Sequence, residues 1–241
     1  GIARTIREDV ANIRSLMLPV RFGVDGPSLM EQLADIEQTL VAETDYNAEA
    51  ESLRIAGRTL AGMDSVVVPG VVEDLSTSRI LTMDWLDGIH LPALLARRPD
   101  QAERNRWGEL IARSVMRLGY KGHLLHSDLH PGNFLFMPDG RLGLVDFGCT
   151  RRYTAEELEF MTQAELAGFQ GPEAVRAALI RGADLTASQQ SDERRMAMLR
   201  QWYEWICLPT LDDQPFDFSD PSYISRGMEL WRSLILHRYT R

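Results

Sequence analysis

The chain has 241 residues, 44% hydrophobic and 25% charged, which is ordinary for a globular protein with material for one large domain or two lobes. Its formal net charge of -9 argues against nucleic acid as a partner, because a phosphate backbone is bound by a basic surface. No apolar run approaches the roughly 18 residues of a membrane-spanning helix. Cys149 and Cys207 are far apart in the sequence, which favours a reducing, cytoplasmic location over a disulfide-bonded fold.

The first region is predicted to mix helices and strands. Apolar residues recur every three or four positions over 2–17, which predicts a helix. A second stripe begins at Leu29, and we expect its helix to continue to about Gly57. Two short strands joined by a turn are expected from the valine-rich run 66–72 and the apolar run 79–85.

The remainder is predicted to be mostly helical, with one hairpin. Apolar periodicity predicts helices over 91–96, 101–120, 155–168 and 172–180, with more helix towards the end. Strands at 133–137 and 142–145 are expected on either side of Pro138-Asp139-Gly140, which is a strong hairpin signal. A small mixed region followed by helices predicts an α+β fold.

Two short segments carry the clearest chemical signal. They read His126-Ser127-Asp128-Leu129-His130-Pro131-Gly132-Asn133 and Asp146-Phe147-Gly148. Phosphoryl transfer needs one carboxylate near the nucleophile, and an amide and a second carboxylate that hold magnesium against the phosphates. Asp128 supplies the first, and Asn133 and Asp146 supply the pair. We therefore predict a kinase-like site with ATP and Mg²⁺ as cofactors, Asp128 as a catalytic residue, and Asn133 and Asp146 as metal and nucleotide ligands.

Each of these residues has a simpler interpretation when taken singly. Asp128 can be a turn residue and Asn133 a cap, and only their spacing from Asp146 favours the catalytic interpretation. His126 is predicted to be structural, with its imidazole packed under the loop and bonded to the backbone. Phe147 is predicted to pack in the core beside Asp146.

A third segment resembles a known family. Residues 43–50 read Glu-Thr-Asp-Tyr-Asn-Ala-Glu-Ala, which is similar to the E-x-D-Y-x-x-E-A signature of the UbiB-like (AarF-type) atypical kinase family linked to ubiquinone biosynthesis. Residues 214–218 resemble another family segment. Aminoglycoside and choline kinases share the loop style but lack the helix signature. The resemblance implies a protein-kinase-like two-lobe fold, with a partial N-lobe over 1–86, a helical C-lobe over 87–241 and the nucleotide between them.

The resemblance also implies roles for three acidic residues. Glu49 corresponds to the helix glutamate that pairs with a nucleotide-holding lysine and is counted as catalytic, although a solvated helical carboxylate is the commoner case. Glu43 and Asp45 correspond to an acidic pair that helps to shape the nucleotide pocket. Two residues apart on a helix they point about 200° apart, so both face a cleft only if the helix begins near them or bends.

Met83, Asp84 and Trp85 are predicted to contact the nucleotide because of their position. They follow a predicted strand and precede a helix, where a hinge offers backbone groups to adenine. A buried strand end is an equal alternative for these residues.

The chain departs from the family pattern at the phosphate-binding end. It has no G-x-G-x-x-G and no K-x-G-Q extension, and its single lysine, Lys121, comes too late to be the phosphate-binding lysine. The simplest explanation is that the first strands lie upstream of Gly1. The rival explanation is a natural pseudoenzyme. As it stands, the chain is expected to bind nucleotide weakly and to show little or no turnover.

The substrate is expected to be small rather than a peptide. Ser127 stands where many protein kinases have an arginine that receives an activation-loop phosphate, and no A-P-E follows the second segment. We therefore expect an atypical kinase or ATPase that acts on, or is regulated by, a quinone-like or lipid-like molecule. Two alternatives stay open: a catalytically inactive scaffold for a lipid or quinone biosynthesis assembly, and an aminoglycoside- or choline-kinase-like phosphotransferase. Peripheral contact with a membrane through amphipathic helices such as 2–17 also stays open.

Overall fold

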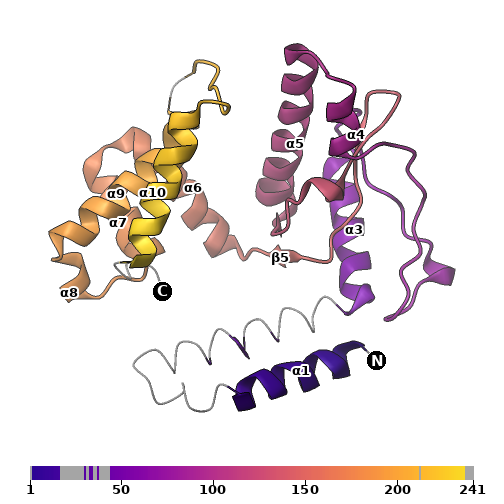
Figure 1. Ribbon diagram of the computed structural model, residues 1–241, viewed down its shortest axis with the longest axis horizontal. Coiled ribbons are helices and arrows are strands. Elements are labelled where there is room, and N and C mark those ends of the chain that lie inside the picture. The colour runs from indigo at the N-terminus through magenta and orange to yellow at the C-terminus, as the bar shows by residue number, and fades with distance from the viewer. Residues whose placement is uncertain are drawn as a thin grey trace. The chain divides into compact units, whose positions relative to one another are not determined.

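The computed structural model of the chain describes residues 2–16, 30, 33–34, 37, 44–211 and 213–236. The chain divides into two compact units, Gly1–Thr154 and Ala155–Arg241 (Figure 1). The predicted division into lobes at residues 86 and 87 falls inside the first unit and stays a prediction.

The described helices of the first unit include two that pack side by side, α3 and α5 (Figure 1). The helices are α1 (Ile2–Leu16), α3 (Tyr46–Leu60), α4 (Leu91–Ala96) and α5 (Gln101–Gly122), with short 3₁₀ turns η2 (Glu73–Leu75) and η3 (Pro131–Asn133). The prediction of α4 is confirmed residue for residue. α5 begins as predicted, where Asp100 accepts a hydrogen bond from the Glu103 N–H, and ends two residues later than predicted, where His123 adopts a left-handed conformation with φ 52°.

The strands of the first unit form two small sheets. They are β1 (Val66–Val67), β2 (Leu124–His126), β3 (Phe134–Phe136), β4 (Leu142–Leu144) and β5 (Thr150–Arg152). The predicted hairpin is confirmed, because β3 and β4 pair antiparallel around Gly140, whose φ of 85° suits a glycine. β1 joins them in parallel with Val66 opposite Leu142, and β2 pairs antiparallel with β5. The pairing of β2 with β5 was not predicted from the sequence.

The core of the first unit lies between α3, α5 and the three-stranded sheet. Its most deeply buried side chains are large and apolar, with at most 2% of each exposed: Leu53, Leu60, Leu118, Leu124, Leu142, Leu144 and Phe147. Burial of each such side chain contributes about 1.5–3 kcal/mol. Because Phe147 belongs to this core, the segment around Asp146 is anchored to the same core as α3.

Two sequence expectations in this unit are wrong. A continuous helix through Glu43 to about Gly57 is not formed, because Thr44 lies in a turn and Asp45 is an extended N-cap whose side chain accepts a hydrogen bond from the Asn47 N–H at 3.1 Å. The helix starts afresh at Tyr46. Most of the predicted helix before Thr44 lies outside the described residues.

The two predicted strands at 66–72 and 79–85 are also mostly absent. Only β1 is a strand, and the two segments meet through single bridges, Val71 with Met83 and Thr77 with Ile80. Pro69 interrupts the first segment because it has no N–H for a ladder.

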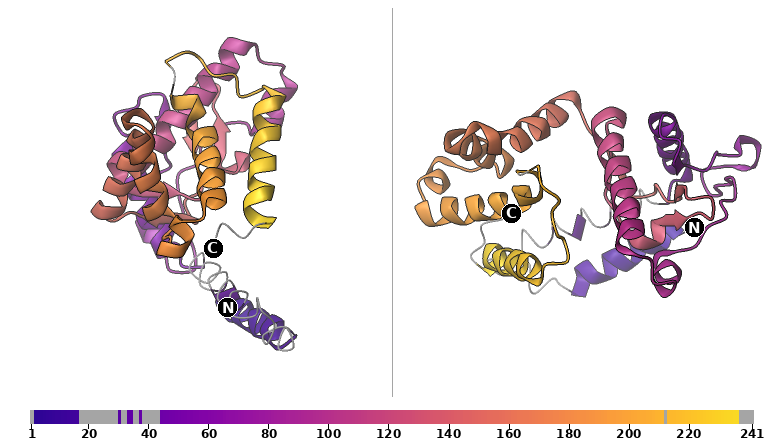
Figure 2. Two further views of the ribbon diagram at one scale, coloured as in Figure 1. Left: turned by 90° about the vertical axis from the view of Figure 1, so that its left-hand side faces the viewer. Right: turned by 90° about the horizontal axis from the view of Figure 1, so that it is seen from above.

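The described residues of the second unit contain helices joined by turns and loops, with no strand, and these helices pack on one another (Figure 2). They are α6 (Ala155–Gln170), α7 (Pro172–Gly182), α8 (Ala187–Gln190), α9 (Glu193–Cys207), η4 (Leu208–Thr210) and α10 (Pro221–Leu236). The predictions of α6 and α7 are confirmed, each helix being two residues longer than expected. α9 and α10 are in close contact where Trp205 lies over Gly227, and the indole Nε1 donates to the Tyr223 carbonyl at 2.9 Å.

Candidate active site

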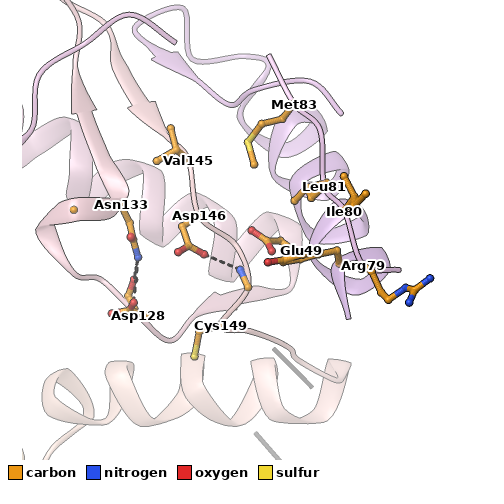
Figure 3. Close-up of a pocket in the computed structure, with 13 residues that line it drawn as sticks. Glu49, Arg79, Ile80, Leu81, Met83, Asp128, Asn133, Val145, Asp146 and Cys149 are labelled. Carbon is orange, nitrogen blue, oxygen red and sulfur yellow. Dashed lines mark hydrogen bonds between the residues drawn. The ribbon is translucent and has the colours of Figure 1, made fainter. Parts of the chain in front are cut away.

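A pocket of about 760 Å³ lies in the first unit, between the start of α3, the segment 79–83 and the two loops that flank the β3–β4 hairpin (Figure 3). Its lining mixes acidic, amide and apolar side chains with one arginine. The lining residues are Tyr46, Glu49, Arg79, Ile80, Leu81, Met83, Asp128, Gly132, Asn133, Val145, Asp146, Gly148 and Cys149.

In the 126–133 loop, Asp128 and Asn133 are bonded to each other (Figure 3). The Asn133 Nδ2 donates to the Asp128 carbonyl at 3.0 Å and to the Asp128 Oδ2 at 3.2 Å. The main-chain N–H of His130 donates to the other carboxylate oxygen, Asp128 Oδ1, at 3.2 Å. Asn133 is buried where η3 joins β3, with 9% of its surface exposed. Since its Nδ2 is engaged, Oδ1 is the amide atom left to contact a cation.

The 146–148 turn is hydrogen-bonded to a buried histidine, His126. The Gly148 N–H donates to Asp146 Oδ1 at 2.9 Å, and the His126 Nε2 donates to the Asp146 carbonyl at 2.8 Å. His126 is only 4% exposed, and its burial lowers the pKa of the imidazole, so the ring is neutral with its proton on Nε2. Phe147 is fully buried. The structural roles predicted for His126 and Phe147 are confirmed.

Glu49 reaches the same turn from the first part of α3. Burial raises the pKa of its carboxyl, the carboxylate of Asp146 raises it further, and a hydrogen bond with the backbone of Phe147 opposes both effects. A Cβ on Gly148 would lie 3.4 Å from Asp146 Oδ1 and 3.6 Å from Glu49 Oε2. The two carboxylates therefore lie near each other on one wall of the pocket (Figure 3).

The structure brings together most of the site residues predicted from the sequence. Glu49, Met83, Asp128, Asn133 and Asp146 all line the pocket, although they come from segments as far apart as α3 and β4. Their chemical roles stay predictions.

Other predicted site residues lie elsewhere. Asp45 is the exposed N-cap of α3, and Glu43 lies outside the described residues. Asp84 Oδ2 accepts a hydrogen bond from the Gly70 N–H at 3.0 Å, and Trp85 is 91% exposed. None of Asp45, Asp84 and Trp85 lines the pocket.

Sequence reasoning missed several lining residues. Tyr46 follows directly after the N-cap inside the family-like signature, and this position was the available signal for it. Arg79, Ile80 and Leu81 reach the pocket from a tight turn closed by the bond of the Thr77 N–H to the Ile80 carbonyl at 2.7 Å. No pattern of spacing marked these three residues.

The oxygen atoms of the pocket suit magnesium. Among the described residues no group of three or more His, Cys, Asp or Glu side chains forms a ready-made metal cage. Magnesium seldom needs one, since it binds through one or two protein oxygens and completes its octahedron with water and phosphate. Asp146 and the Oδ1 of Asn133 provide such oxygens, since both residues line the pocket.

Comparison with protein families matches residues 1–171 to the ABC1 atypical kinase-like domain. The chain belongs to this family. The resemblance predicted from the loop and the helix signature is thereby confirmed, since relatives of the chain include kinases named COQ8. The fold is a kinase-like α+β fold, as predicted.

Relatives of this ABC1 chain occur in bacteria, plants and animals. An uncharacterized protein of Synechocystis, slr0889, is 29% identical over 180 residues, which cover 69% of this chain and 44% of the relative. The mitochondrial atypical kinase COQ8B of Rattus norvegicus is 31% identical over 158 residues, which cover 65% of this chain and 29% of the relative. The chain thus spans less than half the length of these curated relatives.

A solved structure shares the fold. It is the complex of Rv3197 with erythromycin from Mycobacterium tuberculosis, with a TM-score of 0.61 and 22% sequence identity over 97% of this chain and 63% of that one. Within the described part of this ABC1 chain, no helix is both long enough and apolar enough to cross a membrane.

Proposed function

We propose that the pocket binds Mg-ATP and supports phosphoryl transfer or ATP hydrolysis. One observation carries this proposal: Asp128, Asn133 and Asp146, whose order and spacing in the sequence match a kinase catalytic loop and metal-binding turn, line one pocket. Membership of an atypical kinase-like family makes the same chemistry the leading candidate.

Each residue has a defined task in this proposal. Asp146 and the Oδ1 of Asn133 hold magnesium, which when bound neutralises charge on the phosphates. Asp128 orients the acceptor hydroxyl or water, and its two carboxylate oxygens are already aligned by the N–H of His130 and the amide of Asn133. Glu49 provides the negative charge that meets a cationic side chain at the phosphates.

Met83 is the residue best placed to receive adenine. In the antiparallel bridge between Met83 and Val71, the neighbouring residues make the two bonds, from the Asp84 N–H to the Gly70 carbonyl at 2.9 Å and from the Val72 N–H to the Thr82 carbonyl at 2.8 Å. Peptide groups alternate along a strand, so the N–H and C=O of Met83 point to the opposite edge. That orientation suits recognition of a planar base by the backbone.

The acceptor in this proposal is a quinone-like or lipid-like small molecule. The resemblance of residues 43–50 to the signature of a family linked to ubiquinone biosynthesis suggests this class. In addition α6 begins at Ala155, soon after Gly148, which leaves little chain for a peptide-docking segment. Contact with a membrane surface belongs to the same proposal, because such substrates partition into lipid.

One observation favours a second candidate, a catalytically inactive scaffold. Among the described residues Arg79 is the only cation that lines the pocket, and Lys121 is exposed in the last turn of α5. A pocket without a lysine on the phosphates binds nucleotide without fast turnover. The two candidates therefore differ in turnover, and share dependence of nucleotide binding on Asp146.

The test is an ATPase and phosphotransfer assay on the full-length protein, with and without lipid vesicles and quinone analogues. Asp146→Asn should abolish turnover, whereas the matched control Asp139→Asn should not, because Asp139 lies in the hairpin turn paired with Arg141 at 2.7 Å. Equal rates for the wild type and Asp146→Asn would refute the metal assignment. Nucleotide binding that requires Asp146, without turnover in any condition, would favour the scaffold.

A further inference from the structure

α3 is joined to the segment after Asp146 by a pair of hydroxyl groups as well as by Glu49. The Ser52 Oγ and the Thr150 Oγ1 lie 2.8 Å apart, although they are 98 residues apart in the sequence. Ser52 lies three residues after Glu49, on the same face of the helix. Thr150 is the first residue of β5, where it pairs with His126.

The hydroxyl pair leads directly into the 146–148 turn. Thr150 Oγ1 also lies 3.1 Å from the Phe147 carbonyl, and Ser52 Oγ lies 3.1 Å from the Ala48 carbonyl. Two hydroxyl protons serve three contacts, so only two contacts can be full hydrogen bonds at one time. When Ser52 donates to Thr150 and Thr150 donates to Phe147, a continuous chain of bonds links α3 to the residue beside Asp146.

A link between α3 and the 146–148 turn opposes the electrostatic repulsion between two nearby carboxylates, those of Glu49 and Asp146. Asp146 Oδ1 and Glu49 Oε2 both lie within 3.6 Å of the position a Gly148 Cβ would take. Without a cation, this repulsion acts to separate α3 from the turn. The hydroxyl pair is uncharged and half-buried, so it resists that separation at any pH and with little competition from water.

We propose that Ser52 and Thr150 are positioning residues that hold α3 against the 146–148 turn and thereby set the affinity of the pocket for a divalent cation. This inference rests on the proposed function, because it assumes that Asp146 is a metal ligand. Removal of either hydroxyl lets Glu49 and Asp146 move apart, and the cation then meets a less well-formed site.

The test is a titration of the 241-residue chain with Mn²⁺, which takes the same oxygen ligands as magnesium, followed by electron paramagnetic resonance of the free ion. Thr150→Val keeps the β-branched shape that suits a strand, and Ser52→Ala introduces the best helix former. Each should weaken Mn²⁺ binding about fivefold, the loss expected for one net hydrogen bond. The double variant should be no weaker than either single variant, and Thr150→Ser should bind within about twofold of wild type.

Thr162→Val is the matched control, because the Thr162 hydroxyl donates only within α6, to Leu158 at 2.9 Å. Wild-type affinity in both Thr150→Val and Ser52→Ala, an equal loss in Thr162→Val, or a double variant about 25-fold weaker would overturn the inference. If circular dichroism shows Thr150→Val unfolded, Ser52→Ala alone decides. Failure of the proposed function looks different, since Asp146→Asn would then bind Mn²⁺ as tightly as the wild type.

Discussion

Replacing Glu49 by glutamine should stabilise the metal-free chain at neutral pH. Partial burial and the nearby Asp146 both raise the pKa of the Glu49 carboxyl above its ordinary value of 4.5. Glutamine keeps the shape and retains an oxygen for the hydrogen bond with the backbone of Phe147, but it carries no charge. The substitution therefore removes an unfavourable ionisation and leaves the packing intact.

The geometry around Gly148 gives the size of the repulsion between the Glu49 and Asp146 carboxylates. Asp146 Oδ1 and Glu49 Oε2 lie 3.4 and 3.6 Å from the same point, so their separation is at most the sum of these distances, 7.0 Å. Two unit charges about 7 Å apart repel by about 0.6 kcal/mol in water and by about 2.4 kcal/mol at an effective dielectric constant of 20. Because Asp146 is exposed, solvent screening reduces this repulsion to about 1 kcal/mol. For a chain of this size, that raises the melting temperature by about 2–4 °C.

The assay is thermal unfolding of wild type and Glu49→Gln at pH 7 and at pH 3. A raised pKa means that the folded state binds the proton more tightly, so the wild type loses stability relative to the variant as the pH rises through the folded-state pKa. Below 4.5 the carboxyl is protonated in both states and the two proteins should converge. Glu51→Gln is the control, because Glu51 is exposed and paired with Arg54 at 3.2 Å, so its loss should not stabilise. Equal or lower stability of Glu49→Gln at pH 7 refutes the reasoning.

Three further outcomes are expected. Gly227→Ala should destabilise the chain by about 2 kcal/mol or more in urea unfolding, because its Cβ would lie 2.1 Å from Trp205 Cζ2, whereas Gly108→Ala, with open space around it, should stabilise by up to about 1 kcal/mol. Asn133→Ala should lower the free energy of unfolding by about 1–2 kcal/mol, because it leaves the Asp128 carboxylate without its amide partner, and should weaken Mn²⁺ binding at least tenfold, because it removes the proposed ligand atom Oδ1. Calorimetry on the 241-residue chain should give a Kd for Mg-ATP weaker than about 10 μM, since the described pocket lining contains no lysine; a tighter Kd contradicts this.

Local signals in the sequence were enough to predict α4, α5, α6, α7 and the hairpin. The turn Pro138-Asp139-Gly140 and the strands beside it fold through contacts a few residues apart, and α4 has its periodicity and its proline at the start. The structural roles of His126 and Phe147 were also assigned correctly, since both rings are buried. The two candidate site residues of the 126–133 loop, Asp128 and Asn133, could be predicted together because the hydrogen bonds that position them span only two to five residues.

What the sequence did not reveal depends on contacts between distant segments. The parallel pairing of Val66 with Leu142 joins residues that no local pattern connects. The position of Asp84, bonded to Gly70, follows from the bridge between Val71 and Met83, which is too short to produce an alternating pattern. Arg79 is brought to the pocket by the same short bridged segment, so no alternating pattern marked it either.

The residues of the proposed site fall into two groups, according to whether contacts within one short segment or contacts between distant segments hold them in place. The half of the pocket that we propose to face the metal, Asp128, Asn133 and Asp146, is held by hydrogen bonds that span two to five residues and by the fully buried Phe147. Glu49 reaches that half from α3, through contacts between segments that are distant in the sequence, and the like charge of Asp146 opposes its approach. Substitutions of these three residues should therefore weaken cation binding at least tenfold, whereas substitutions along α3 should change the affinity by smaller, graded amounts.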